Sequence, residues 1–240
     1  MAEKRIKCAL IEKHEVVPGV KRFLFSPEEK LDYKAGQFAF FEFDLDNSEY
    51  SKHFTISNSP EREKVEITTM IRESDYKKAL DSLEPRHDVY IKGVGGNFTL
   101  EEEPEKTIVF LAGGIGITPV KSMLEYAIDK GLSMKAKLFY SNREKKFIAY
   151  EKELDSIMGN LDDLEIIHTL TDISHEEVSS WKGETGFIDQ KMIETHVKEP
   201  DSSIFYISGP PSFNEAMNKM LKEQIGLNKE NVKTENFSGY

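Results

Sequence analysis

The 240-residue sequence predicts two domains: a small antiparallel β-barrel or sandwich, followed by a parallel, doubly wound α/β sheet. Two observations predict this division. Up to about residue 100, short strand-like runs alternate with turns, whereas strand-like and helix-like runs alternate from about residue 105 onward. The charged segment EEEPEK, residues 101–106, separates the two patterns. We therefore expect one domain over residues 1–103 and a second over residues 104–240.

The first half is predicted to consist mainly of short strands. Its strand-like runs are IKCALIEKHEV, GVKRFLFS, GQFAFFEFDL, HFTISN, KVEITTMI and DVYIKGV. Turn signals at Pro18-Gly19, Asp46-Asn47 and Ser59-Pro60 punctuate these runs, which is typical of a small barrel or sandwich. We expect one helix in this half, at about Asp75–Leu83.

The second half is predicted to alternate strands with helices. Strands are expected at Thr107–Ala112, Lys135–Ser141, Leu164–Leu170 and Ser203–Ser208. Apolar residues recur at helical spacing over residues 120–128 and 213–221, so each segment is a predicted helix with one buried face.

Both of these helices carry capping signals. Thr118 is expected to cap the first helix, with Pro119 at its first position and Gly131 at its end. Ser212 and Glu215 form a capping-box pattern at the start of the second helix.

The composition excludes several classes of function. A formal net charge of -11 argues against a nucleic-acid partner. Cys8 is the one cysteine, so this sequence holds neither an internal disulfide nor a four-cysteine iron–sulfur cluster. The six histidines show no ligand spacing, so no metal site is predicted, and the carboxylates are expected to be solvated surface charges.

No membrane span or secretory signal is predicted. No stretch approaches the roughly 20 apolar residues of a membrane helix. Residues 1–5 lack the apolar segment of a secretory signal, so we expect a cytoplasmic protein.

A glycine-rich loop, LAGGIGITPV at residues 111–120, lies between a predicted strand and a predicted helix. Glycine lets the chain turn and lets a phosphate approach the backbone, while the helix start offers unpaired N–H groups and a positive dipole end. Gly114 and Gly116 fit this pattern, but Pro119 stands where the usual fingerprint has a third glycine. The loop therefore predicts a dinucleotide phosphate site that differs from the common Rossmann loop.

Read together with this loop, other stretches resemble one family. KHFTISNSP (52–60) resembles the flavin-binding Arg-x-Tyr-Ser/Thr signature, and YISGPPSF (206–213) resembles the Cys-Gly-Pro-Pro signature. HDVYIKGVGGNFTL (87–100) and the terminal TENFSGY resemble two further elements of the same family. The motifs occur in the order typical of the ferredoxin–NADP reductase superfamily. The resemblance implies an antiparallel flavin-binding β-barrel followed by an α/β nicotinamide-binding domain.

The resemblance assigns flavin-binding roles in the first domain. Lys52 stands at the place of the arginine that pairs with flavin phosphate; it keeps the charge but loses the bidentate fork. Phe54 stands at the aromatic that packs on the flavin, and Thr55 matches the hydroxyl residue that hydrogen-bonds the N5 edge. His53, between them, is expected to contact the backbone or to be structural.

A second basic stretch bears on the choice of flavin. In MIRESDYKKAL, Arg72 and Lys77 would serve the phosphates of a dinucleotide, and Met70 and Ile71 would border the cofactor. A solvated helix face is the alternative interpretation of these basic residues. The pattern favours FAD over FMN.

The resemblance assigns nicotinamide-binding roles in the second domain. The loop residues Gly114, Gly116, Thr118 and Pro119 are expected to meet the dinucleotide pyrophosphate. Asn142 and Arg143 end the next predicted strand, where an acid would hold an NADH ribose and a cation an adenosine phosphate. Arg143 favours NADPH over NADH, although Glu144 beside it weakens that inference.

The resemblance also implies a reacting zone. Ser208 replaces the family's usual cysteine where the nicotinamide approaches the flavin, and Gly209, Pro210 and Pro211 follow it. Glu235 and Phe237 match the terminal Glu-x-aromatic element, and Tyr240 is a candidate to cover the flavin. Thr55, Ser208 and Glu235 are the candidate catalytic residues.

The predicted function is a flavin-dependent NAD(P)H oxidoreductase. Hydride would pass between nicotinamide and FAD, and single electrons would pass to a separate carrier such as ferredoxin. A free-flavin or ferric reductase is the enzymatic alternative. A non-catalytic flavodomain that acts as a binding or regulatory subunit is the alternative outside enzymes.

Overall fold

The computed structural model describes residues 5–101, 106–174 and 178–236, and the chain divides into two compact units. Unit 1 comprises Met1–Leu100 and Lys121–Lys130, and unit 2 comprises Glu101–Val120 and Gly131–Tyr240. The predicted boundary between residues 103 and 104 falls outside the described residues and stays a prediction. The assignment of Lys121–Lys130 to the first unit was not anticipated from the sequence.

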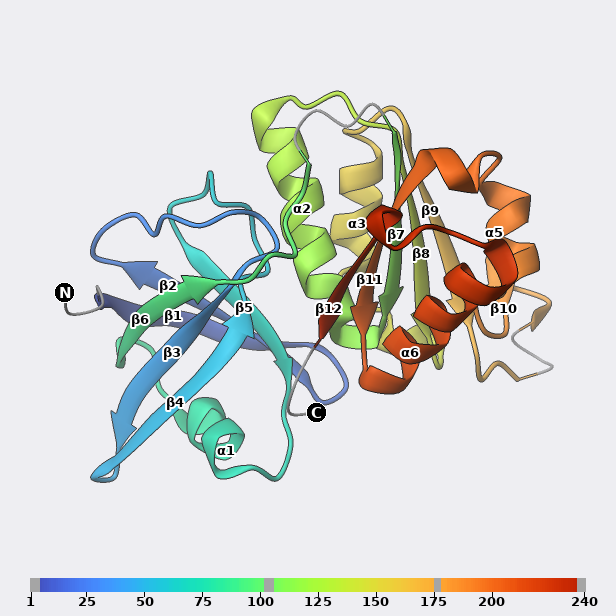
Figure 1. The fold of residues 1–240 in the computed structure, drawn as a ribbon. Helices are drawn as coiled ribbons and strands as arrows, with labels where there is room; N and C mark the ends of the chain where they lie inside the picture. Colours follow the sequence, from blue (N-terminus) through green and yellow to red (C-terminus); the bar gives the residue numbers. More distant parts are fainter. Residues whose placement is uncertain (1–4, 102–105, 175–177, 237–240) are drawn as a thin grey trace. The chain divides into compact units, whose positions relative to one another are not determined.

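Unit 1 is built around a six-stranded antiparallel sheet with the strand order β4-β3-β6-β1-β2-β5 (Figure 1). The segment that follows β4 meets β5, because the Ser57 N–H donates to the carbonyl of Glu66 at 2.8 Å. The two edges of the sheet therefore approach one another, as expected for a barrel. Its elements are β1 (Ile6–Val17), β2 (Val20–Pro27), β3 (Phe38–Leu45), β4 (Ser48–Thr55), β5 (Val65–Met70), α1 (Asp75–Ser82) and β6 (Asp88–Gly95).

The aromatic run of β3 forms the centre of the unit 1 core. Side chains alternate across a strand, so Ala39, Phe41 and Phe43 are buried while the residues between them are partly exposed. The Phe41 ring lies 5.4 Å from that of Phe25 and 6.1 Å from that of Phe54. The core thus joins β2, β3 and β4 beneath the predicted flavin signature.

Unit 2 contains a six-stranded parallel sheet with the strand order β10-β9-β8-β7-β11-β12. The four strands expected from the sequence all form, with bounds within one residue of those predicted. The strands are β7 (Thr107–Gly113), β8 (Ala136–Asn142), β9 (Leu164–Leu170), β10 (Glu184–Thr185), β11 (Ser203–Gly209) and β12 (Val232–Asn236).

The sheet of unit 2 is doubly wound. Helices α5 (Gln190–His196) and α6 (Pro211–Met220) pack in one core cluster against one face, and α3 (Glu151–Met158) lies on the other (Figure 1). The strands progress outward from β7 in both directions, which makes the β7–β11 boundary a topological switch point. In such sheets, ligands bind beyond the carboxyl ends of the strands at this point.

Two capping predictions are wrong. Helix α2 (Ile117–Lys130) continues directly from the 3-10 turn Gly114–Gly116, so Thr118 lies inside the first turn and its hydroxyl donates to the Ile115 carbonyl at 3.1 Å. Pro119 is consequently the third residue of the helix. Pro210 occupies the cap position of α6, so Ser212 lies inside that helix and forms no capping box.

Within the described ranges, none of the helices combines the length and apolarity that a membrane crossing requires. Among the same residues, no group of three or more His, Cys, Asp and Glu side chains is arranged to hold a metal ion.

Candidate functional site

A cluster of three cations marks a candidate binding site in unit 1. The cationic cluster consists of Lys52 on β4, Arg72 after β5 and Lys77 on α1. Lys77 is 5% exposed, and its Nζ donates to Thr69 Oγ1 at 2.9 Å and to the Met70 carbonyl at 2.7 Å. Burial, together with the charges of Lys52 and Arg72, lowers the pKa of Lys77 to about 8.

Two of the three cations in this cluster have no acidic partner among the described residues. Among the described residues, no carboxylate forms an ion pair with Lys52 or Lys77. A buried ammonium with no counter-charge is expensive, and such a perturbed group is characteristic of a binding site. An anionic ligand such as a pyrophosphate would supply the missing charge. The structure therefore brings together four of the predicted residues, Lys52, Met70, Arg72 and Lys77. Ile71 lies between Met70 and Arg72 in the chain.

The flavin signature on β4 divides between the two faces of the strand. Phe54 is 8% exposed and belongs to the barrel core, where its ring lies 5.5 Å from that of Tyr76. Its contact with a flavin stays a prediction. His53 faces the other way and packs near Phe38 and Phe40, with ring distances of 5.2 and 5.5 Å. This agrees with a structural role for His53.

Thr55 ends β4 and is 7% exposed. Its hydroxyl makes no hydrogen bond with any described residue. A hydroxyl without a protein partner can donate to or accept from a ligand. The bond between Thr55 and the N5 edge of a flavin stays a prediction.

Two glycines of the loop in unit 2, Gly114 and Gly116, have different roles. Gly114 has a φ of +52°, and nothing lies within 4 Å of where a Cβ would be, so its role is to turn the chain beside open space. A Cβ on Gly116 would lie 2.1 Å from the carbonyl oxygen of Ser208. Gly116 is thus required for the close packing of the loop on the end of β11, a demand that exists without any pyrophosphate.

Ser208 and Glu235 are neighbours on adjacent parallel strands, where they are paired in register. The Ser208 hydroxyl is buried and has no hydrogen-bond partner among the described residues. Burial raises the pKa of the Glu235 carboxyl to about 7, and Asn214 donates its side-chain N–H to the Glu235 carbonyl at 2.6 Å. The structure therefore places two of the three candidate catalytic residues side by side.

The end of β8 carries the predicted adenosine-side residues. Asn142 is 5% exposed, and its Nδ2 is buried with no hydrogen-bond partner among the described residues. Arg143 is largely exposed, and its guanidinium lies 3.5 Å from a carboxylate oxygen of Asp172. Glu144 is visible in the sequence as a charge that competes for Arg143, whereas the contact with Asp172 is seen only in the structure. The predicted cofactor residues Phe237 and Tyr240 lie outside the described residues.

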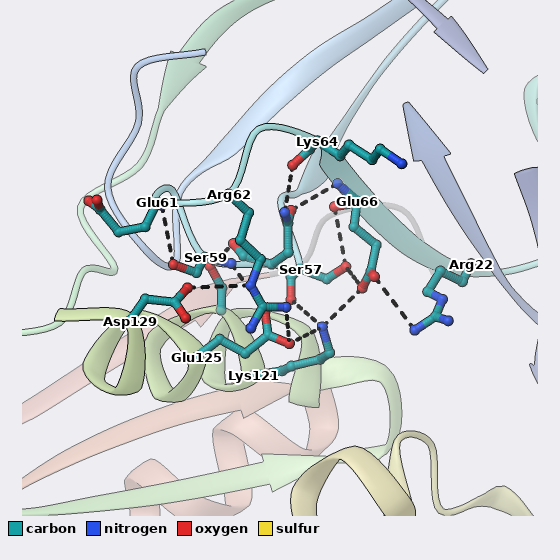
Figure 2. Close-up of polar contacts among 12 residues, drawn as sticks. Arg22, Ser57, Ser59, Glu61, Arg62, Lys64, Glu66, Lys121, Glu125 and Asp129 are labelled. Atoms are coloured by element: carbon teal, nitrogen blue, oxygen red, sulfur yellow. Dashed lines mark hydrogen bonds and ion pairs between the residues drawn. The ribbon is translucent and has the colours of Figure 1, made fainter. Parts of the chain in front are cut away.

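One expectation about acidic residues is wrong. Glu66 and Glu125 are 7% and 5% exposed, and both form an ion pair with the buried ammonium of Lys121 (Figure 2). The carboxylates are therefore not uniformly solvated surface charges. The i,i+4 spacing of Lys121 and Glu125 was visible in the sequence, but the same spacing is common on exposed helix faces.

Two family models match consecutive parts of the chain. The model for the oxidoreductase FAD-binding domain matches residues 7–100, and that for the oxidoreductase NAD-binding domain matches residues 110–219. The chain belongs to the ferredoxin–NADP reductase-like family of FAD- and NAD-binding oxidoreductases. The cationic cluster and the free Thr55 hydroxyl lie in the part matched as FAD-binding, and they fit the phosphates and the N5 edge of that group.

Curated relatives of this family are longer proteins. The chain is 32% identical over 163 residues to the F subunit of the Na(+)-translocating NADH-quinone reductase of Yersinia pestis (strain Pestoides F), a match that covers 66% of this chain and 39% of the relative. It is 25% identical over 208 residues to the glycine betaine monooxygenase reductase subunit of Chromohalobacter salexigens, covering 85% of this chain and 56% of that protein. The chain thus spans about two fifths to just over half of these relatives.

Solved structures share the fold over nearly the whole chain. The FAD/NAD-binding domain of nitric oxide dioxygenase from Vibrio cholerae O1 biovar El Tor superposes with a TM-score of 0.83 at 18% identity, covering 97% of this chain and 98% of that one. A ferredoxin NADP+ reductase from Neisseria gonorrhoeae, solved with bound FAD and NADP, gives 0.81 at 17% identity, with coverage of 97% and 98%. These likenesses establish the two-domain fold.

Proposed function

We propose that this chain is a flavin-dependent NAD(P)H oxidoreductase that delivers electrons to a separate acceptor. The cationic cluster carries this proposal, because Lys77 is a buried cation without a counter-charge in the part of the chain matched as FAD-binding. FAD, when bound, supplies hydride acceptance at N5 and the division of an electron pair into single electrons.

In unit 1 the chain's task is to hold and orient the flavin. Lys52, Arg72 and Lys77 would bind its phosphates, and the pyrophosphate would restore charge balance around Lys77. Two phosphates suit three cations better than one, which favours FAD over FMN. The Thr55 hydroxyl would hydrogen-bond the N5 edge, where it can donate or accept as required.

In unit 2 the chain's task is to hold the nicotinamide dinucleotide. The turn at Gly114 and the start of α2 would bind its pyrophosphate through backbone N–H groups. The unpaired Ser208 hydroxyl would orient the nicotinamide ring. Glu235, with a pKa of about 7, would hold or release a proton at neutral pH beside it.

We propose NADH as the preferred electron donor. Arg143 alone favours NADPH, but the neighbouring Asp172 carboxylate both competes for the guanidinium and repels a 2′-phosphate. The name of the quinone reductase relative also specifies NADH.

We propose that the acceptor is a small electron carrier such as ferredoxin. The two curated relatives are named as reductase subunits, so electron delivery to another protein is a natural extension to this chain. We place the reaction in the cytoplasm, where a free buried thiol such as Cys8 stays reduced.

Anaerobic stopped-flow mixing tests the proposal. The chain is loaded with FAD and mixed with NADH or NADPH in parallel, and bleaching of the flavin absorbance is followed. We expect rapid bleaching, faster with NADH. Steady-state turnover with ferredoxin, free flavin and a ferric chelate then identifies the acceptor. A chain that binds no FAD, or whose flavin stays oxidised with both donors, would be a binding or regulatory module.

A further inference from the structure

Lys121 lies at the middle of a row of buried and half-buried charges inside unit 1 (Figure 2). Its ammonium is 2.8 Å from a Glu125 carboxylate oxygen and 3.1 Å from one of Glu66. Glu66 in turn lies 3.6 Å from Arg22, and Glu125 lies 3.0 Å from Arg62. Cations and carboxylates therefore alternate along the row, and each buried charge has an opposite neighbour.

The protein gains little stability from such an arrangement. Withdrawing charges from water largely offsets their mutual attraction, so apolar residues of similar volume would serve equally well. Burial by itself would raise the pKa of Glu66, yet Lys121, Ser57 and Arg22 together bring it below the usual range. Glu66 is thus held as a carboxylate, with directional bonds that an apolar contact would lack.

These directional bonds converge on the backbone just after Thr55, within the flavin signature. Ser57 donates its N–H to the Glu66 carbonyl at 2.8 Å and its hydroxyl to the Glu66 carboxylate at 2.8 Å, while its own carbonyl accepts from Lys121 at 3.2 Å. On the same helix, Ser122 donates to the Asn58 carbonyl at 2.6 Å. Ser57, two residues after Thr55, is therefore bonded on three sides.

We propose that Lys121 is a positioning residue for hydride transfer, which holds the Thr55–Ser57 segment in the geometry that the reaction needs. This inference rests on the function proposed above. Hydride transfer depends steeply on the placement of the reacting atoms, and a 1 Å displacement can slow a reaction by roughly 100-fold.

The test separates positioning from stability. Lys121→Met leaves Glu66 and Glu125 each with one fewer cation, so it can weaken the fold. The double variant Lys121→Met/Glu66→Gln also removes the negative charge of Glu66, which would otherwise have lost the Lys121 cation. The side-chain oxygen of the glutamine can still accept a hydrogen bond from Ser57. The double variant is compared with Glu66→Gln alone. Lys130→Met is the matched control, because Lys130 lies on the same helix and pairs with Glu61 at 3.1 Å but is exposed.

Two measurements are made on each variant. Stopped-flow reduction by NADH gives the hydride-transfer rate constant, with the FAD dissociation constant determined separately. Amide hydrogen exchange of the chain without flavin, read in peptides that cover residues 54–60, reports the backbone directly and does not depend on activity.

We expect the double variant to reduce its flavin about 10- to 100-fold more slowly than Glu66→Gln. Its FAD dissociation constant should change by less than about twofold, because the cationic cluster is untouched. Exchange over residues 54–60 should accelerate in the double variant and not in Lys130→Met.

Three results would overturn the inference: an unchanged rate constant, a loss of rate matched by an equal loss of FAD affinity, or unchanged exchange in the double variant. A wild-type chain whose flavin neither NADH nor NADPH reduces would instead refute the proposed function itself.

Discussion

Two lysines of unit 1 are almost equally buried and have opposite surroundings. Lys77 on α1 is 5% exposed and Lys121 on α2 is 1% exposed. Lys121 contacts two carboxylates, whereas Lys77 contacts a hydroxyl and a carbonyl and has two further cations nearby. The charge of Lys121 is balanced by carboxylates of the chain itself. The charge of Lys77 would be balanced only when an anion binds.

This difference distinguishes a buried charge that is part of the folded structure from a buried charge that serves to bind a ligand. A buried cation whose partners are all in the protein adds nothing to a ligand's affinity, but its loss leaves carboxylates uncompensated. A buried cation without an acidic partner destabilises the empty protein, and the ligand recovers that free energy on binding. Substitutions at the two lysines should therefore move stability and affinity in different directions.

The largest expected effect is on stability at the balanced site. Lys121→Met should lower the free energy of unfolding of the flavin-free chain by about 3 kcal/mol, the lower end of the range for breaking a buried pair, because each carboxylate keeps one other cation. Thermal unfolding of the wild-type and variant chains measures this. A melting temperature equal to that of the wild type would mean that the row of charges is hydrated in solution.

At the unbalanced site the effect should fall on affinity. Lys77→Met should weaken FAD binding about 10- to 100-fold through the loss of a charge-assisted contact. Without flavin, the variant should be at least as stable as the wild type, because a poorly solvated charge has been removed. Titration of FAD fluorescence, alongside thermal unfolding, measures both. Lys78→Met is the control, since Lys78 is exposed on the same helix and pairs with Glu73.

Glu235 extends the comparison to a carboxylate that has no cationic partner among the described residues. Its folded-state pKa of about 7 exceeds its ordinary value of 4.5, so it loses its proton as the pH rises through 7. In the function proposed above, Glu235 lies beside the nicotinamide ring, which becomes positively charged as it gives up hydride, so the ionised carboxylate should favour the transfer. We expect the rate of flavin reduction to rise severalfold above pH 7, and Glu235→Gln to flatten the profile. A step near pH 7 that persists in this variant would assign the titration to another group.

The lowered pKa of Lys77 predicts a pH dependence of FAD affinity. In the empty chain the ammonium is present well below pH 8 and is lost as the pH rises through about 8. FAD affinity should therefore decrease above pH 8 in the wild type and change less in Lys77→Met. Between about pH 8 and 10.5 the unfolded chain holds more protons at this site, so the stability of the empty chain should rise with pH.

The smallest effect is expected at the exposed pair after β8. Asp172→Asn should raise kcat/KM for NADPH relative to NADH by about two- to fivefold, as befits an exposed charge. Arg143→Ala should change the same ratio in the opposite direction. Identical changes for both dinucleotides would show that neither residue meets the adenosine phosphate.

The sequence determined the architecture because the relevant signals are local. Strand alternation, helical spacing and the glycine loop predicted both sheets and the place of each motif. The caps of α2 and α6 were mispredicted, because the chain enters α2 through a 3-10 turn and α6 through a proline. Such entry geometry depends on the packing of the preceding loop. The sequence also identified the members of the cationic cluster. Lys52 was found through its likeness to the flavin signature, and Arg72 and Lys77 as basic residues suited to dinucleotide phosphates.

Only the tertiary structure decided which charges are buried. Lys121 and Lys130 occupy the same helix, and each has an acidic partner, yet one side chain is 2% exposed and the other 43%. The partners of Lys121 on the barrel side lie 55 and 64 residues away along the chain. Burial of a charge is set by these distant contacts, and no local pattern of residues encodes them.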